Sequence, residues 1–313
     1  MDIVLLFPGQ GSQRPGMGRD LADAFPEARA VFERADEVLG TPLSRLCFDG
    51  PAEELTLTHN AQPALLVHGA AAWAAVRDRL APCVRAAAGH SLGEFTAYHA
   101  ADALSLDDAV RLVRRRGELM YESGVRRPGA MAAILGDTNR PVDELCALAS
   151  AEAGLAVPAN YNSPGQIVIS GETAGVERAM ALAREAGARR AVRLNVSGAF
   201  HSPLMDYAVP GLQRALDAAR MEDPAFPVYA NVTTEEVTDA TRAARLLLEQ
   251  LTSPVRWTDE VRAMAAHHPD ALYVELGPGS VLVGLVKKIA PSLRTATCGT
   301  AGEVEQLLEL VAS

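Results

Sequence analysis

A serine stands between two glycines in the run Gly89-His90-Ser91-Leu92-Gly93. This is the G-x-S-x-G pattern of a nucleophile elbow, a tight strand-to-helix turn that exposes the serine Oγ. The flanks agree with such a turn, because residues 84–88 are apolar except for Arg85 and residues 92–103 have a helical pattern of small residues. The helix N-terminus would favour negative charge that develops beside Ser91. The alternative is a glycine-rich turn whose serine only caps a helix.

A glycine-rich loop, Pro8-Gly9-Gln10-Gly11-Ser12-Gln13, follows the apolar run of residues 3–7. It lacks the Gly-Lys-Ser/Thr ending of a phosphate-binding P-loop and the third glycine of a dinucleotide-binding fingerprint. Two interpretations remain open. The loop is either a plain strand-to-helix turn or a segment that presents backbone N–H groups and the Gln10 amide to an anion.

One arginine lies on the apolar side of the helix expected over residues 106–120. At about 100° per residue, Arg116 falls in the middle of an apolar stripe formed by Ala109, Leu112, Val113, Leu119 and Met120. An arginine keeps its charge, so a buried one needs a carboxylate or several acceptors. Arg116 therefore forms a structural ion pair, extends its head group to water, or awaits an acidic ligand.

The histidines show no metal-ligand spacing such as H-E-x-x-H, so the sequence predicts no metal site. His201 follows Phe200 and lies shortly before Pro203, away from any clear helical face. A histidine can act as a general base near neutral pH. A lone histidine is more often structural, and the residues alone leave both interpretations open.

The order of expected elements changes between residues 130 and 196. It becomes β-α-β-β-α-β, with strands over residues 130–135, 155–160, 167–170 and 191–196 and helices over residues 142–151 and 175–186. That order is the split βαβ, or ferredoxin-like, unit. The sequence therefore predicts a large α/β domain of residues 1–127 and 198–313, with a small ferredoxin-like domain, residues 128–197, inserted into it.

Composition narrows the classes of function. The 313 residues are 49% hydrophobic and 22% charged, as in an ordinary globular protein. A net charge of −10 argues against binding to nucleic acid or to an anionic membrane surface. Residues 55–76 carry no charged side chain, but Pro63 and the polar residues beside it favour a buried helix over a membrane span. Four scattered cysteines and the lack of a basic leader favour a cytoplasmic location.

Together these motifs resemble the malonyl-CoA:acyl-carrier-protein transacylases, the stand-alone acyltransferases of fatty-acid and polyketide synthesis. The resemblance spans essentially the whole chain and rests on residues 7–13, 62–64, 89–94, 116–117, 160–166, 198–202, 253–257 and 275–279. It implies a hydrolase-like α/β domain with a parallel sheet and a nucleophile elbow, carrying a ferredoxin-like insert.

The resemblance also implies roles for individual residues. Ser91 would be the acylated nucleophile and His201 its general base and acid. The backbone N–H groups of Gln10 and Leu92 would form the oxyanion hole, and Arg116 would bind the malonyl carboxylate. Malonyl would pass from coenzyme A to the serine, and then to the phosphopantetheine thiol of an acyl carrier protein. The implied enzyme is a monomer that binds no cofactor or metal.

Four further residues complete the expected site. Gln62 and Asn162 would line the acyl pocket and help to hold the site, and the main-chain carbonyl of Gln250 would orient the histidine in place of a triad acid. In related acyltransferases an aromatic residue at the position of Phe200 accompanies malonyl, the unbranched extender.

Carrier proteins are acidic as a class, so docking on this acidic chain needs a local basic patch. Lys287 and Lys288, on the helix expected over residues 281–289, are the candidates. The alternative is an ordinary solvated helix face.

Other functions remain open. An acyl hydrolase, such as a thioesterase acting on carrier-protein thioesters, would use Ser91 and His201 in the same way, but neutral acyl chains give Arg116 no purpose. A non-catalytic docking module would not need an intact serine, histidine and glycine-rich loop. The choice between the fatty-acid and polyketide pathways is not decided by the sequence.

Overall fold

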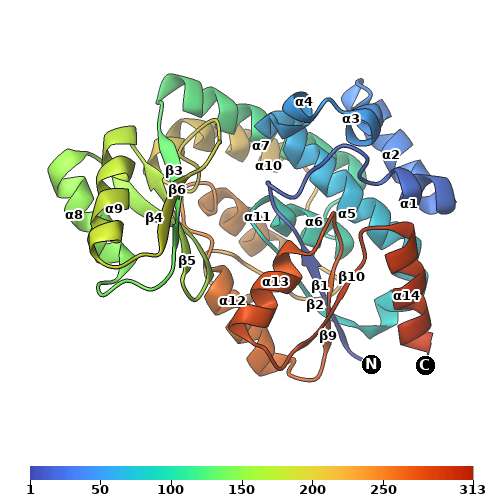
Figure 1. Ribbon diagram of the computed structural model, residues 1–313. Helices are drawn as coiled ribbons and strands as arrows, with labels where there is room; N and C mark the ends of the chain where they lie inside the picture. Colours follow the sequence, from blue (N-terminus) through green and yellow to red (C-terminus); the bar gives the residue numbers. More distant parts are fainter. Residues whose placement is uncertain (313) are drawn as a thin grey trace.

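A six-stranded sheet forms the centre of the large part of the molecule (Figure 1). The structure, a computed structural model, describes residues 1–312. The strand order is β10-β9-β1-β2-β7-β8, with bounds Ile3–Phe7 (β1), Val84–Gly89 (β2), Val228–Tyr229 (β7), Glu236–Val237 (β8), Leu272–Glu275 (β9) and Arg294–Thr297 (β10). Neighbouring strands run parallel except for β7 and β8. All five residues of β1 are buried, as expected for a central strand of a parallel sheet.

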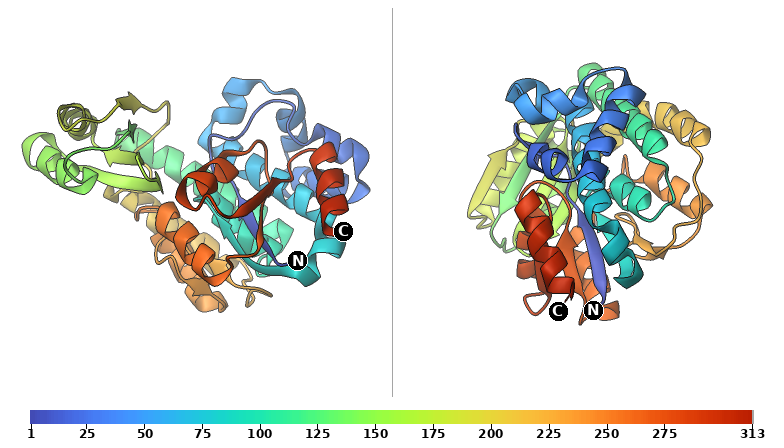
Figure 2. Two further views of the ribbon diagram at one scale, coloured as in Figure 1. Left: turned by 60° about the horizontal axis from the view of Figure 1, so that its bottom comes forward. Right: turned by 90° about the vertical axis from the view of Figure 1, so that its right-hand side faces the viewer.

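Helices cover both faces of this sheet (Figures 1 and 2). Because side chains alternate along a strand, Ile3, Leu5 and Phe7 join the core that holds α2, α5 and α7, whereas Val4 and Leu6 join the core that holds α12 and α13. The helices of this part are α1 (Arg19–Ala24), α2 (Pro26–Leu39), α3 (Leu43–Asp49), α4 (Ala52–Thr56), α5 (Thr58–Leu80), α6 (Leu92–Ala100), α7 (Leu106–Arg126), α10 (Val209–Ala218), α11 (Ala240–Glu249), α12 (Trp257–His267), α13 (Val281–Ile289) and α14 (Ala301–Ala312), with short 3-10 helices at Ala81–Cys83 and Pro203–Ala208.

A second, antiparallel sheet lies to one side of the first (Figure 2, left). Its order is β4-β5-β3-β6, and its bounds are Ala130–Leu135 (β3), Ala156–Ser163 (β4), Gln166–Gly171 (β5) and Arg190–Arg193 (β6), with helices α8 (Val142–Ala153) and α9 (Thr173–Glu185). This is the strand order of the expected ferredoxin-like unit, which is confirmed as the second part of the α/β fold. Backbone hydrogen bonds join it to the rest, from Tyr161 N to Val255 O and from Val255 N to Ala159 O. The boundaries at residues 128 and 197 stay a prediction.

Several expected helices are confirmed, with different ends. A proline inside the helical pattern of residues 19–38 predicts two short helices, and α1 and α2 are separated directly before Pro26. Residues 55–76 fall mostly within α5, which is buried along most of its length. Helix α6 ends at Ala100, three residues before the expected end, because the chain turns at Asp102, whose φ is 59°. Helix α7 continues to Arg126. It ends there because Pro128 disfavours helical geometry at Arg127, the residue before it. Within residues 1–312, no helix combines the length and the apolar character that crossing a membrane requires.

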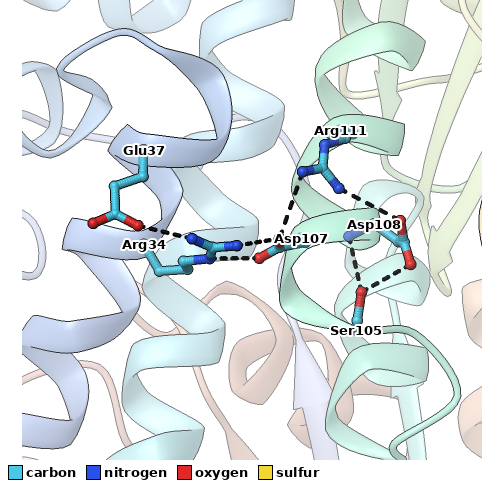
Figure 3. A network of polar contacts seen from close by, with 6 residues as sticks. All are labelled: Arg34, Glu37, Ser105, Asp107, Asp108 and Arg111. Atoms are coloured by element: carbon cyan, nitrogen blue, oxygen red, sulfur yellow. Dashed lines mark hydrogen bonds and ion pairs between the residues drawn. The ribbon is translucent and has the colours of Figure 1, made fainter.

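Helix α7 begins at a capped and cross-linked N-terminus (Figure 3). Ser105 followed by Asp108 resembles a capping box, and Ser105 Oγ accepts a hydrogen bond from Asp108 N at 3.1 Å. Arg34 of α2 donates to both carboxylate oxygens of Asp107, at 2.8 and 2.6 Å, and also to Glu37. These exposed contacts lie at the start of the helix that carries Arg116 into the core.

Candidate active site

Ser91 occupies a strained turn between β2 and α6. Its φ of 54° and ψ of −107° lie outside the regions that L-residues ordinarily adopt. The two motif glycines permit this turn, because a Cβ on Gly89 would lie 1.9 Å from Gly93 C and a Cβ on Gly93 would lie 2.0 Å from Phe7 O. The G-x-S-x-G run therefore forms an elbow. Its serine is not merely a helix cap, because its hydroxyl lies within hydrogen-bond distance of His201 and Arg116.

His201 stands beside the serine. Its Nε2 lies 2.8 Å from Ser91 Oγ, and its Nδ1 lies 2.9 Å from Gln250 O and 3.2 Å from Ser253 O. Carbonyl oxygens accept only, so Nδ1 carries the proton and Nε2 is free to accept one from the serine. Burial first, and the charge of Arg116 second, lower the pKa of His201 to about 3. The ring is therefore neutral, which is the protonation state that a base requires.

Arg116 is buried without an acidic partner. Its side chain donates to Gln62 Oε1 at 2.7 Å, to Gln250 Oε1 at 2.9 Å and to Ser91 Oγ at 3.1 Å. Only 1% of the residue is exposed, and within residues 1–312 its Nε has no partner and no ion pair reaches its guanidinium. Burial lowers the pKa of Arg116 to about 10, so the group remains charged at neutral pH. Two of the three interpretations, the ion pair and the extension to water, are therefore excluded.

A cavity of about 120 Å³ opens beside these groups. A water molecule occupies about 30 Å³ in the liquid, so the space suits a small acyl group. Its lining includes polar residues, among them Ser91, His201, Arg116, Gln62 and Asn160, and apolar residues, among them Met120, Met131, Leu194, Val196 and Phe200. Such a cavity can receive a short acyl chain that carries a negative charge at its far end.

Two residues that line this cavity, Gln10 and Leu92, have backbone N–H groups without an acceptor in the described part of the chain. Leu92 is the first residue of α6, so its N–H has no acceptor within the helix. The N–H of Gln10 has no acceptor within residues 1–312, while its side-chain amide donates to Thr58 Oγ1 at 3.3 Å. Their role as the donors of an oxyanion hole stays a prediction.

The remaining expected residues are placed as follows. Gln62 and Phe200 line the cavity, but Asn162 does not, and the asparagine that lines it is Asn160. Asn162 lies two residues further along β4, within the irregular pairing between Tyr161 and Ser163, and its Oδ1 is 2.8 Å from His90 Nε2. Asn162 therefore contacts a residue of the cavity lining, and its expected role in lining the pocket and holding the site stays a prediction.

Lys287 and Lys288 are exposed on α13, away from the lining of the cavity. Lys288 Nζ lies 3.5 Å from Gln166 Oε1 of the second sheet. Nothing in these contacts distinguishes a docking patch from a solvated helix face. Their docking role stays a prediction.

Sequence reasoning missed a buried polar cluster directly behind the serine. It includes the side chain of Gln250, of which only the main-chain carbonyl was expected, and three fully buried residues, Glu94, Asn231 and Glu260. Ser91 N donates to Asn231 Oδ1 at 2.7 Å, and Gln250 Nε2 donates to Ser91 O at 3.0 Å. The one local signal is Glu94, the only acid in the helix just after the elbow.

Comparison with known proteins agrees with this geometry. Residues 4–307 match the family model of the acyl transferase domain. The chain is 46% identical over 308 residues to the malonyl CoA-acyl carrier protein transacylase of Bacillus subtilis strain 168, which covers 98% of this chain and 96% of the relative.

Solved structures give the same result. An acyl-carrier-protein S-malonyltransferase from Bartonella henselae has a TM-score of 0.95 at 41% identity, with all of both chains covered. A malonyl-transacylase solved in complex with its type II polyketide synthase acyl-carrier protein has a TM-score of 0.94 at 39% identity, with 99% of this chain and 100% of that one covered. With matches of this extent in both sequence and fold, the chain belongs to the malonyl-CoA:acyl-carrier-protein transacylase family.

Proposed function

We propose that this chain transfers the malonyl group of malonyl-CoA to the phosphopantetheine thiol of an acyl carrier protein, through a malonyl ester on Ser91. The observation that carries the proposal is the unpaired guanidinium of Arg116, which shares a small cavity with Ser91 and His201. Family membership supports the same reaction. The donor is a thioester of coenzyme A and the acceptor is the thiol of the carrier protein, and both end in a phosphopantetheine arm. One site can therefore serve both half-reactions.

In the first half-reaction, His201 Nε2 takes the proton of Ser91 Oγ as that oxygen attacks the thioester carbonyl. The carbonyl oxygen becomes an anion, which the N–H groups of Gln10 and Leu92 stabilise; one such donor is worth about 3 kcal/mol of barrier. The carbon–sulfur bond then breaks. The coenzyme A sulfur takes the proton from His201 and leaves, so that the serine ester remains.

Arg116 selects the acyl group. A planar guanidinium binds a carboxylate through two parallel hydrogen bonds, so the malonyl carboxylate completes a cation that has only neutral partners, Gln62, Gln250 and Ser91, in the free protein. An acetyl group has no charge to offer and would leave the cation unpaired. The site therefore prefers malonyl over acetyl.

The second half-reaction reverses the first with a different thiol. The phosphopantetheine thiol gives its proton to His201 Nε2 and attacks the ester carbonyl, and Ser91 leaves with that proton. The acceptor is an acyl carrier protein, the kind of partner with which the related malonyl-transacylase was solved. The reaction uses no bound cofactor or metal, and the monomeric state and cytoplasmic location expected from the sequence belong to this proposal.

The competing function is hydrolysis of acyl thioesters by the same serine and histidine. Incubation of the pure protein with radiolabelled malonyl-CoA, with and without carrier protein, separates the two. Transfer predicts a stable labelled protein that loses its label to the carrier protein when that is added. Release of free malonate at the same rate with or without carrier protein would contradict transfer and support hydrolysis.

A further inference from the structure

The strained backbone of Ser91 is held by two side-chain amides from distant parts of the chain. Asn231, which follows β7, accepts from Ser91 N at 2.7 Å, and Gln250, which follows α11, donates to Ser91 O at 3.0 Å. A residue in a sparsely populated φ/ψ region persists only where its surroundings fix it. These two contacts fix the donor and the acceptor of the serine's own backbone.

Asn231 can make its contacts in only one orientation. Its Oδ1 accepts from Ser91 N and, at 3.3 Å, from Gln250 Nε2, while its Nδ2 donates to Gly89 O at 2.7 Å and to Glu260 Oε2 at 2.9 Å. Rotating the amide by 180° would set oxygen against two acceptors and nitrogen against two donors. The surrounding groups therefore determine where the oxygen that holds the serine lies.

The backbone of Asn231 is held as firmly as its side chain. Its N–H donates to Glu94 Oε2 at 3.1 Å, and its carbonyl accepts from Arg256 N at 3.0 Å. Glu94 Oε2 also accepts from Gln250 Nε2 at 2.7 Å, so one carboxylate joins the two residues that hold Ser91.

Burial of the carboxyl groups in this cluster is energetically unfavourable, yet neither Glu94 nor Glu260 lines the cavity. Glu94, Asn231 and Glu260 are fully buried and do not line the cavity beside Ser91. Within residues 1–312, one oxygen of each carboxylate has no hydrogen-bond partner. Burial raises the pKa of Glu94 to about 7 and raises that of Glu260 well above its usual range. Polar groups that are unfavourable to bury and do not reach the substrate can serve the reaction only through the residues that they hold in place.

We propose that Asn231 is a positioning residue for acyl transfer: its amide, held in orientation by Glu260, fixes the backbone of Ser91 so that the hydroxyl faces His201 and the oxyanion donors. The inference rests on the proposed role of Ser91 as nucleophile. It deepens that role by naming what keeps the nucleophile in place.

The test uses a probe that does not depend on Arg116. Phenylmethanesulfonyl fluoride carries no carboxylate; Ser91 Oγ attacks its sulfur, fluoride leaves, and His201 takes the proton. Asn231→Leu removes both the acceptor for Ser91 N and the donor to Gly89 O. We expect sulfonylation of Ser91 and kcat for malonyl transfer to fall together by about 100-fold, the usual effect of a small misplacement. KM for malonyl-CoA should change less than about threefold, because Arg116 and Gln62 are untouched.

A second pair of variants keeps the test decisive if Asn231→Leu does not fold. Glu260→Gln keeps an oxygen that can accept from Asn231 Nδ2, whereas Glu260→Leu does not. The glutamine variant should therefore react with the sulfonyl fluoride about tenfold faster than the leucine variant.

The matched control is Glu275→Gln, another fully buried carboxylate, which accepts from Leu282 N and Val283 N at the start of α13. It should lower the melting temperature without changing the rate of sulfonylation. Folded Asn231→Leu with a rate within about threefold of wild type would overturn the proposal, as would equal rates for the two Glu260 variants. Wild-type protein that is sulfonylated at Ser91 but never malonylated would contradict the proposed function instead.

Discussion

Two arginines at helix α7, one that contacts its start and one that belongs to it, have opposite kinds of partner. Arg34, on α2, pairs with Asp107 at the exposed start of α7 through both carboxylate oxygens (Figure 3), and Glu37 adds a third contact. Arg116, in the buried part of the same helix, has only neutral acceptors, which are two amide oxygens and a hydroxyl. The exposed cation contacts two acids, whereas within residues 1–312 no acid forms an ion pair with the buried one, on which the charge of Glu94 acts only from a distance.

This difference in partners indicates that Arg116, and not Arg34, is available to bind a charged ligand. An exposed ion pair is screened by solvent and contributes little to stability. A buried charge without a counter-ion is unfavourable, because neutral dipoles replace its hydration only in part. Such a cation gains most when a ligand brings the missing carboxylate. The predictions below test this contrast, from the largest expected effect to the smallest.

Ser91→Ala should abolish the malonyl-enzyme, because no other hydroxyl occupies the elbow beside His201. The loss of transfer should exceed about 1,000-fold, since removing a nucleophile leaves only binding and the oxyanion donors. Mass spectrometry of the protein after incubation with malonyl-CoA measures the ester. A malonyl adduct on another residue of the variant, formed at the wild-type rate, would contradict the assignment.

Arg116→Ala should reduce kcat/KM for malonyl-CoA by about 30- to 5,000-fold, because breaking one side of a poorly solvated charge pair costs about 2–5 kcal/mol. Arg111→Ala is the matched control. Arg111 lies on the same helix but is exposed beside Asp107 and Asp108, and its loss should leave transfer unchanged. Equal losses in the two variants would remove the contrast between buried and exposed cations.

Phe200→Ala should admit a branched acyl group. Phe200 is one of the apolar residues that line the cavity, so its truncation leaves room for the extra methyl of methylmalonyl-CoA. One methyl in an apolar pocket changes specificity by about 10- to 200-fold, and the ratio of kcat/KM for the two thioesters measures the gain. Phe226→Ala, outside the cavity lining, is the control. An unchanged ratio in Phe200→Ala would exclude Phe200 as the discriminating side chain.

Arg116 should also set the acid limit of the reaction. Its charge is the second cause, after burial, that depresses the pKa of His201. Wild-type His201 stays neutral until the pH falls towards about 3, so sulfonylation should not decline between about pH 7 and pH 5. In Arg116→Ala the pKa of His201 should rise, and a decline should begin at higher pH. Identical pH profiles would show that the cation does not act on the base.

Arg34→Ala should have the smallest effect. The side chain is half exposed and its ion pair is screened, so neither transfer nor the melting temperature should change measurably. Differential scanning calorimetry beside the transfer assay provides the measurement. A marked loss of transfer would mean that the start of α7 controls the position of Arg116.

Patterns within one element were predictable from the sequence. The change between strand-like and helix-like patterns along the sequence located the four strands of the second sheet and their two helices. Pro26 located the break between α1 and α2. The stripe around Arg116 predicted a buried cation, because a helical period relates neighbours three and four residues apart. The length of this helix was underestimated, because α7 continues beyond Met120 to Arg126, with Ser123 and Gly124 buried.

Contacts between distant segments were not predictable from residues alone. Ser91 and His201 are 110 positions apart, and only the family resemblance joined them. Asn231, 140 positions from Ser91, carried no signal, because a single asparagine after a short apolar run is ordinary. Asn162 was named from the family resemblance, and the irregular pairing of β4 around it cannot be read from the strand's alternation. Orientation across a tertiary contact depends on backbone positions that no local pattern encodes.

The most direct test of the unpaired cation is the preference for malonyl-CoA over acetyl-CoA in Arg116→Ala, measured as a ratio of kcat/KM values beside the melting temperature. If the malonyl carboxylate is the missing partner, the preference should fall by at least about 30-fold. Acetyl transfer should hold or improve, because a neutral acyl group no longer lies beside an uncompensated charge, and the melting temperature should stay close to that of wild type. A variant that melts far lower and loses both activities in equal proportion would show that Arg116 serves the fold, not the substrate.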